Sequence, residues 1–265
     1  MRIIKFYIKK IFSSLGYDII FSNPNKQNNF TLNQSNWPTQ RENPITFFEA
    51  DKSFHEVYNL AQEKTQMWDT DNALRRQRHY TLNYLLKCAP MGVGDVCEVG
   101  CFRGLSSYQI ASYLKENHEN SDFHIFDSFE GLSDIRSMDD ENIKMEDKIK
   151  VQEQFACSLK IVRENLQEFN FIKFYPGWIP ERFKEVEQLV FSFVHIDADL
   201  YQPIYDSIKF FYPRMIKNGI MVFDDYGSTY FTGAKRAVDK YIHTIKNHFF
   251  LPLPSGQAFL IKNDQ

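Results

Sequence analysis

The stretch Phe191–Gly227, FSFVHIDADLYQPIYDSIKFFYPRMIKNGIMVFDDYG, predicts a strand, a helix and a second strand. Phe191–Ile196 is a short apolar run, the pattern of a strand that is buried on both faces. Ile204–Tyr212 has helical spacing of its apolar residues, and Asn218-Gly219 is a turn signal. Ile220–Phe223 then predicts the second buried strand. Because a helix that connects two parallel strands brings both strand ends to one edge of the sheet, the stretch indicates an α/β fold.

Carboxylates follow both of these strands. Asp197 and Asp199 follow the first strand, and Asp224 and Asp225 follow the second. Open α/β sheets bind ligands at this edge. Unpaired carboxylates at close range repel one another unless a cation lies among them, and hard divalent ions such as Mg²⁺ prefer oxygen ligands. The simpler interpretation is that the acids only cap strand ends and helix starts, but their matching positions after two strands favour a metal site.

The length, the charge and the lack of long apolar runs limit the class of protein. The chain has 265 residues, enough for one α/β domain with an N-terminal extension. Its net charge of −3 gives no argument for nucleic acid as a partner. No apolar run reaches the ~18–20 residues of a transmembrane helix, and no signal peptide is recognisable. We therefore expect a cytoplasmic protein.

The N-terminal part predicts an extension over residues 1–46, ahead of a main domain over 47–265. In that domain we expect a helical cap over 47–90 and an α/β core over 91–265. Met1–Ile20 is basic and amphipathic, which favours a helix packed on the domain or a partner copy, with peripheral membrane contact as the alternative. Phe21–Asn43 is rich in Asn, Gln, Ser and Pro and predicts an irregular arm. Apolar faces on the N-terminal helices favour a homo-oligomer, most simply a dimer.

The cap contains a run dense in cations, Asp71–Tyr80. Such a run is typical of a solvated helix face, although it could also close over a substrate. Ser128–Glu146 is a polar, acidic loop long enough to be a mobile lid. In the core we expect strands over Asp95–Val99, Phe123–Phe126 and Phe171–Tyr175, helices over Leu105–Asn117, Asp147–Phe169 and Ala234–Asn247, and a closing hairpin of Phe249–Leu251 with Gln257–Lys262.

The turn Gly100–Gly104, after the first core strand, predicts the cofactor. Glycines there let the backbone approach a ligand closely. A dinucleotide site has the spacing G-x-G-x-x-G, whereas the spacing here is G-x-x-x-G, preceded by Glu98, whose charge would repel a diphosphate. An acid suits the ammonium and sulfonium groups of S-adenosylmethionine (SAM). Asp127, at the end of the next strand, is placed to accept hydrogen bonds from both hydroxyls of a ribose.

These motifs resemble those of class I SAM-dependent methyltransferases, and more narrowly those of the TylF/MycF (macrocin O-methyltransferase) family of sugar O-methyltransferases. The resemblance covers roughly Thr81 to Lys262. It rests on EVGCFRGLSS (Glu98–Ser107), FDSFEGL (Phe126–Leu132), HIDADLY (His195–Tyr201), FYPRMIKNGIMVFDDYG (Phe211–Gly227) and GAKRAVD (Gly233–Asp239).

The resemblance implies a Rossmann-like seven-stranded sheet with a C-terminal antiparallel hairpin, SAM as cofactor, and Mg²⁺ held by three acids. Carried over by position, the metal ligands are Asp197, Asp224 and Asp225. The predicted cofactor contacts are Glu98, Gly100, Phe102, Gly104, Ser106, Asp127 and Ser128. Of Pro176–Phe183 only Gly177-Trp178 matches the family's pattern, and the first 80 residues match weakly, so the acceptor is left open.

The reaction implied is methyl transfer to a sugar hydroxyl of a surface polysaccharide, a nucleotide-sugar or a glycosylated natural product. A divalent cation on that hydroxyl would lower its pKa and fix it near the methyl group. Asp197 is the predicted metal ligand and possible base, and Asp199 is the rival base. His195 is interpreted as a core histidine. The alternatives are a catechol or phenol methyltransferase, which would need an apolar acceptor slot, and a non-catalytic Rossmann-like interaction module.

Overall fold

The computed structural model describes residues 18–20, 31–33, 50–117, 121–139 and 145–263. The chain forms two compact units, Met1–Lys52 and Ser53–Gln265, and each is described by itself. None of the helices in the described ranges has the length and apolar character needed to cross a bilayer.

The first unit contains a two-stranded antiparallel ribbon. Strand β1 (Asp18–Ile20) pairs with β2 (Thr31–Asn33). The sequence predicts a helix that continues to Ile20 and an irregular arm through Asn33, and both predictions are wrong at these positions. Each strand carries β-branched residues, which favour extended backbone. The rest of the predicted helix lies outside the described residues.

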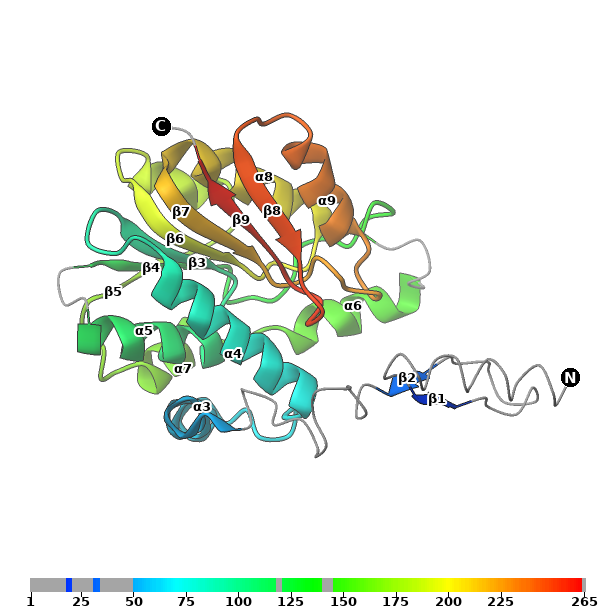
Figure 1. Ribbon diagram of the computed structural model, residues 1–265, viewed down its shortest axis with the longest axis horizontal. Coiled ribbons are helices and arrows are strands. Elements are labelled where there is room, and N and C mark those ends of the chain that lie inside the picture. The colour runs from blue at the N-terminus through cyan, green and yellow to red at the C-terminus, as the bar shows by residue number, and fades with distance from the viewer. Residues whose placement is uncertain (1–17, 21–30, 34–49, 118–120, 140–144, 264–265) are drawn as a thin grey trace, which may run out of the picture. The chain divides into compact units, whose positions relative to one another are not determined.

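The second unit is organised around a seven-stranded sheet with the order β5-β4-β3-β6-β7-β9-β8 (Figure 1). The first five strands in this order are parallel, whereas β9 runs antiparallel to both of its neighbours. The strands are β3 (Asp95–Val99), β4 (Phe123–Asp127), β5 (Ile172–Pro176), β6 (Phe191–Ile196), β7 (Met215–Phe223), β8 (His248–Pro252) and β9 (Ala258–Lys262). The predicted Rossmann-like seven-stranded sheet with a C-terminal antiparallel hairpin is confirmed.

Helices cover both faces of this sheet, with α4 and α5 on one side and α8 and α9 on the other (Figure 1). The helices are α3 (Lys52–Thr65), α4 (Ala73–Cys88), α5 (Leu105–Asn117), α6 (Met145–Gln154), α7 (Leu159–Asn165), α8 (Tyr201–Phe211) and α9 (Gly233–Ile242), with short 3₁₀ helices η2 (Glu181–Val186) and η3 (Tyr212–Arg214). The two layers explain why the central strands read as continuous apolar runs.

Strand β6 shows this packing directly. All six of its residues are buried. Phe193 packs in the cluster that contains residues of α4 and α5, whereas Val194 and Ile196 pack in the cluster that contains residues of α8 and α9. Burying a large apolar side chain contributes about 1.5–3 kcal/mol. The strand is therefore a rigid base for the acids that follow it.

The turn predicted at Asn218-Gly219 is wrong, because both residues lie inside β7. The β6–β7 register shifts between Phe191 and Phe193, and Asn218 has φ 63°. Asparagine tolerates this left-handed conformation better than most residues. The local signal therefore marks an irregularity within a strand and not the end of one.

The single helix predicted over Asp147–Phe169 is also wrong, because the structure has two helices, α6 and α7, in this region. The side chain of Ser158 accepts a hydrogen bond from the backbone N–H of Ile161 and so caps the start of α7. The apolar spacing continues across the break, because Val151 and Leu166 are buried on either side of it.

The predicted lid, Ser128–Glu146, is anchored in the part that the structure describes. The Asp139 carboxylate is 2% exposed and accepts hydrogen bonds from the backbone N–H groups of Arg136 and Tyr201. Ile135 is buried against residues of neighbouring segments. Residues 140–144 lie outside the described ranges, and α6 begins at Met145. The loop is thus tied to the start of α8, close to the predicted acids.

Candidate active site

The carboxyl ends of the parallel strands meet at one edge of the sheet. The backbone N–H of Asp197 donates to the carbonyl of Val99, and that of Asp224 donates to the carbonyl of Ile196. Gly100 follows β3 with φ 85°, and a Cβ there would overlap the carbonyl oxygen of Asp197. The cofactor turn and the first acid therefore touch, and only glycine fits between them.

A cavity of about 440 Å³ opens at this edge. Among the predicted site residues, it is lined by Gly100, Phe102, Ser106, Asp127, Ser128, Asp197, Asp199, Asp224 and Asp225. Glu98 and Gly104 do not line it. The structure thus brings nearly all of the predicted cofactor and metal residues around one space.

Asp127 organises the cofactor side of this cavity. One of its carboxylate oxygens accepts hydrogen bonds from the backbone N–H groups of Cys101 at 2.8 Å and Phe102 at 3.2 Å. The other accepts from the N–H of Phe129 at 2.7 Å. The acid therefore holds the turn after β3 in place. Ser128 beside it donates to the carbonyl of Gly131.

Glu98 lies behind the cavity and is fully buried. It accepts a hydrogen bond from the hydroxyl of Ser107, and its other oxygen lies 2.9 Å from Nδ1 of His195. In this structure its partners are protein groups, whereas the sequence predicts a cofactor contact. The other ring nitrogen of His195, Nε2, is buried without a hydrogen-bond partner and lies 3.6 Å from a carboxylate oxygen of Asp224. One side of the His195 ring is therefore bonded within the core, to Glu98, and the other side lies beside Asp224.

Four acids form a cluster on the other side of the cavity. Asp197, Asp199 and Asp225 each place an oxygen within 4.8 Å of the others, and Asp197 and Asp224 do the same with His195. The predicted metal trio is therefore divided between two overlapping groups that share Asp197. The Asp199 backbone N–H donates to Asp225 at 3.0 Å, and Gln257 donates to Asp224 at 2.6 Å.

The environment of these acids disfavours their charge. Burial, together with the Asp197 charge, raises the pKa of Asp199 to about 7. Burial and the charges of Asp199 and Asp197 raise the pKa of Asp225 well above its usual range. A divalent cation would relieve this repulsion, and carboxylate oxygens are its preferred ligands. The donor set and the unpartnered nitrogen of His195 therefore fit a metal ion.

Helix α4 supplies site residues that the sequence analysis did not single out. Arg75, Arg78, His79 and Leu82 line the cavity. Arg78 donates to the side chain of Asp224 and lies 3.7 Å from a carboxylate oxygen of Asp225. Burial lowers the pKa of His79 well below its usual range. The i, i+3, i+4 and i+7 spacing places these four on one helix face. This spacing could have indicated a shared site, but the run was interpreted as a solvated helix face.

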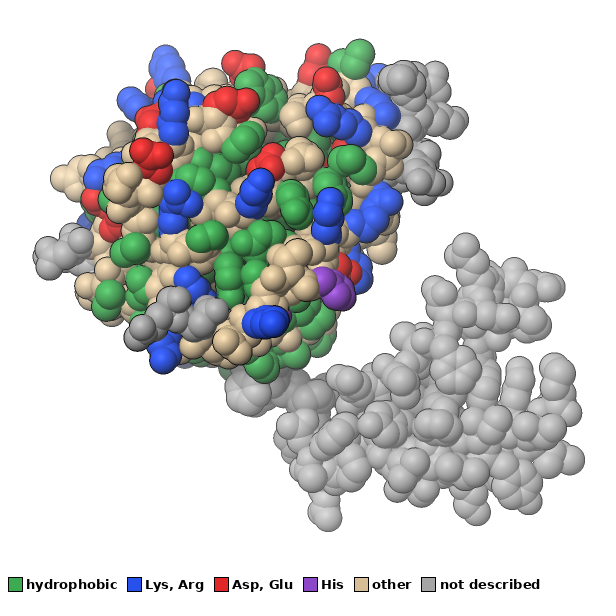
Figure 2. Space-filling model, turned by 90° about the horizontal axis from the view of Figure 1, so that it is seen from above, with side chains coloured by type: hydrophobic (Ala, Val, Ile, Leu, Met, Phe, Trp, Pro, Cys, Tyr) green, Lys and Arg blue, Asp and Glu red, His purple; other side chains and the backbone are tan. Residues whose placement is uncertain are grey.

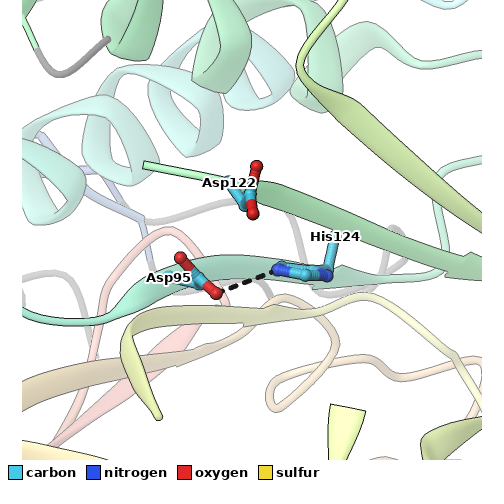
Figure 3. Close-up of side chains that lie close together, drawn as sticks. All are labelled: Asp95, Asp122 and His124. Atoms are coloured by element: carbon cyan, nitrogen blue, oxygen red, sulfur yellow. Dashed lines mark hydrogen bonds and ion pairs between the residues drawn. The ribbon is translucent and has the colours of Figure 1, made fainter. Parts of the chain in front are cut away.

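A second cluster of potential metal ligands, Asp95, Asp122 and His124, lies away from the cavity, near the amino ends of β3 and β4 (Figure 3). His124 is buried, and its two ring nitrogens lie 3.1 Å from a carboxylate oxygen of Asp95 and 2.9 Å from the hydroxyl of Tyr175. Asp122 is paired with Lys173. The internal partners of these side chains explain the cluster as a structural network.

The outer surface in the view of Figure 2 is mixed in charge. Lys and Arg side chains are interspersed there with acids and apolar groups.

Comparison with known proteins gives a family match over residues 86–249, to the model described as macrocin O-methyltransferase (TylF). A Streptomyces olivaceus protein, 8-demethyl-8-(2,3-dimethoxy-alpha-L-rhamnosyl)-tetracenomycin-C 4'-O-methyltransferase, is 26% identical over 141 residues, 50% of this chain and 53% of that protein. The demethyldecarbamoylnovobiocin O-methyltransferase of Streptomyces niveus is 26% identical over 157 residues, 56% of this chain and 58% of that protein. The matches thus span little more than half the length of these curated relatives.

Solved structures share the fold. The calicheamicin methyltransferase CalS11 superimposes with a TM-score of 0.61 at 16% identity, covering 85% of this chain and 100% of that chain. The O-methyltransferase NovP gives a TM-score of 0.56 at 21% identity, covering 71% and 81%. At these identities the likeness establishes the architecture alone.

Proposed function

Since this chain belongs to the macrocin O-methyltransferase (TylF) family, we propose that it is a SAM-dependent O-methyltransferase that uses Mg²⁺ or a similar cation to methylate a sugar hydroxyl. One observation carries the proposal. The glycine turn after β3 and the acids after β6 and β7 border the same cavity of about 440 Å³. A methyl donor and a metal-bound acceptor need this juxtaposition, because the reacting atoms must be held about 3–3.5 Å apart.

The turn and the end of β4 form the proposed SAM site. Gly100, Phe102, Ser106 and Ser128 line this part of the cavity. Asp127 would accept the ribose hydroxyls while it holds the turn. Glu98 acts on the site from behind, through Ser107 and His195, rather than by contact with the cofactor. The indirect role that we propose for Glu98 differs from the direct contact with SAM that the resemblance implies.

The acids after β6 and β7 form the proposed metal and acceptor site. Asp197, Asp224 and Asp225 would hold the cation, which when bound supplies a Lewis acid that lowers the pKa of the acceptor hydroxyl. Asp197 and Asp199 are the two carboxylates placed to take the proton. Bound SAM would supply the methyl group, whose carbon would bond to the acceptor oxygen as the carbon–sulfur bond breaks and sulfur keeps the electron pair.

The acceptor that we propose is a hydroxyl of a sugar, carried by a glycosylated small molecule, a nucleotide-sugar or a surface polysaccharide. The tetracenomycin relative, by its name, acts on a rhamnosyl compound, which makes a 6-deoxyhexose the first acceptor to try. The acid side of the cavity is lined by polar groups that include Arg75, Arg78 and Ser228. Apolar side chains, among them Trp178, Tyr230 and Phe231, line the same cavity, so the acceptor assay below decides between a polyhydroxylated acceptor and a catechol.

Calorimetric titration of the purified protein tests the cofactor part of the proposal. Micromolar binding of SAM, without binding of NAD⁺, is the expected result, followed by Mg²⁺ binding to the SAM complex. Rhamnosylated compounds, TDP-rhamnose and a catechol are then incubated with SAM and Mg²⁺, and the S-adenosylhomocysteine formed is quantified. If a folded, cofactor-free sample does not bind SAM, the proposal is wrong and the interaction-module reading takes its place. If only the catechol is methylated, the sugar assignment is wrong.

A further inference from the structure

We propose that Arg78 is a built-in counter-ion of the acid cluster, which competes with the divalent cation for Asp224 and Asp225. The inference rests on the metal dependence in the proposed function and adds a residue to it. Arg78 would hold the two acids while the metal is away and release them when it binds. Helix α4 would thereby sense whether the site is loaded.

The contacts of Arg78 converge on the end of β7. One guanidinium nitrogen donates to the side chain of Asp224 and, at 3.0 Å, to its backbone carbonyl. The same nitrogen lies 3.7 Å from a carboxylate oxygen of Asp225. A single positive group thus faces two of the three acids that are proposed to hold the metal. A metal ion that used the same oxygen of Asp224 would have to displace it.

The pair is built so that Arg78 can leave. The Arg78 side chain is 33% exposed, whereas that of Asp224 is 13% exposed. The guanidinium can therefore move toward solvent, where its charge is well hydrated, without opening the core. Asp224 keeps an anchor when this happens, because Gln257 donates to its other carboxylate oxygen at 2.6 Å. The acid would remain in place for a second cation.

The cluster needs a positive charge in either state. The carboxylates of Asp197, Asp199 and Asp225 lie close together, Asp225 being buried and the other two half-buried. Like charges in such a place repel strongly, so that loss of every cation would destabilise the fold. Among the described residues, Arg78 is the arginine that forms ion pairs with Asp225 of this group and with the neighbouring Asp224. The competition follows, because either Arg78 or the metal can neutralise Asp224.

The experiment measures the affinity for Mn²⁺, by electron paramagnetic resonance of the free ion, in the full chain and its variants. Arg78→Gln should tighten Mn²⁺ binding by about tenfold to a hundredfold, the range in equilibrium constant that a charge-assisted hydrogen bond spans. Arg78→Lys keeps the charge without the planar guanidinium and should fall between wild type and Arg78→Gln. The matched control is Lys87→Gln on the same helix α4, whose exposed ammonium lies over the ring of Tyr84, away from the cavity lining. It removes the same charge and should leave the Mn²⁺ affinity near that of wild type.

Thermal unfolding gives a second readout. Without metal, Arg78→Gln should melt below Lys87→Gln, and Mn²⁺ should raise the melting temperature of Arg78→Gln by more than it raises that of wild type. An unchanged or weaker Mn²⁺ affinity in both Arg78 variants would overturn the inference, as would equal tightening in Lys87→Gln. If no variant binds Mn²⁺, Arg78 has no metal competitor and the inference is wrong. SAM binding and methyl transfer by the wild-type protein then decide the rest of the proposed function separately.

Discussion

Replacing Gly100 with alanine tests the contact between the cofactor turn and the acid strand. Gly100 has φ 85°, and a Cβ there would overlap the Asp197 carbonyl oxygen and lie 2.8 Å from its carbonyl carbon. The left-handed backbone costs about 1–2 kcal/mol for a residue with a side chain. Forcing the two strand ends apart adds about 1–3 kcal/mol, the usual cost of overpacking. We therefore expect Gly100→Ala to lower the free energy of unfolding by about 2–5 kcal/mol.

A matched control separates the two costs. Gly92 has nearly the same backbone conformation, φ 83°, but a Cβ there meets nothing within 4 Å. Gly92→Ala should therefore lose only about 1–2 kcal/mol. Urea unfolding followed by circular dichroism measures both, and calorimetry gives the SAM affinity. We expect SAM affinity to fall in Gly100→Ala and to be retained in Gly92→Ala. Equal stability losses in the two variants would refute the close approach of the strand ends.

Three further outcomes are expected. In chelator the protein should lose stability as pH rises from about 4 to about 7. The reason is that Asp199, with a pKa raised from 3.8 to about 7, keeps a proton in the folded state that the unfolded chain releases. In thermal melts Mg²⁺ should flatten this dependence of stability on pH, and a flat profile in chelator would contradict the burial of the acids. Asp197→Ala and Asp224→Ala should each reduce Mg²⁺-stimulated methyl transfer by about a hundredfold or more, since Lewis-acid stabilisation amounts to several kcal/mol; full activity of both variants in chelator would rule the metal mechanism out. Asp127→Ala should weaken SAM binding at least about tenfold, because two backbone N–H groups of the turn after β3 and that of Phe129 lose their charged acceptor. The Mn²⁺ affinity of this variant should stay unchanged, and SAM binding equal to wild type would remove Asp127 from the site.

The central strands and the edge of the sheet that holds the acids were predictable from local patterns. Phe191–Ile196 reads as a doubly buried strand because every residue in it is buried, so that no alternation survives. The acids follow such strands, and parallel topology then brings the ends together. The break between α6 and α7 was missed because apolar spacing continues through it, although a serine such as Ser158 is a common N-cap residue and could have indicated the start of a helix. Periodicity reports which face of a segment is buried and says little about where the backbone interrupts it.

The contact of Arg78 with the acids could not be predicted from such patterns, for a different reason. Its partner Asp224 lies 146 residues away in sequence, on another element. A cationic helix face has the same composition whether it meets water or acids, so that only the packing of α4 over the strand ends distinguishes the two. The spacing of Arg75, Arg78 and His79 indicates a shared face but not what that face meets.

Glu98 shows what strand register adds to a motif. An acid just before a glycine turn was expected to meet the cofactor, yet the register of β3 against β6 pairs Glu98 directly with His195. Paired residues of neighbouring strands share a face, so the pleat turns Glu98 toward His195 and Ser107 on α5, and its carboxylate is buried behind the ring of His195, which lines the cavity. That orientation leaves Nε2 of His195 beside Asp224, at the edge of the proposed metal site. The buried acid thus orients the ring of His195, and the contacts from Ser107 through Glu98 and His195 to Asp224 connect α5 with the end of β7 through the core.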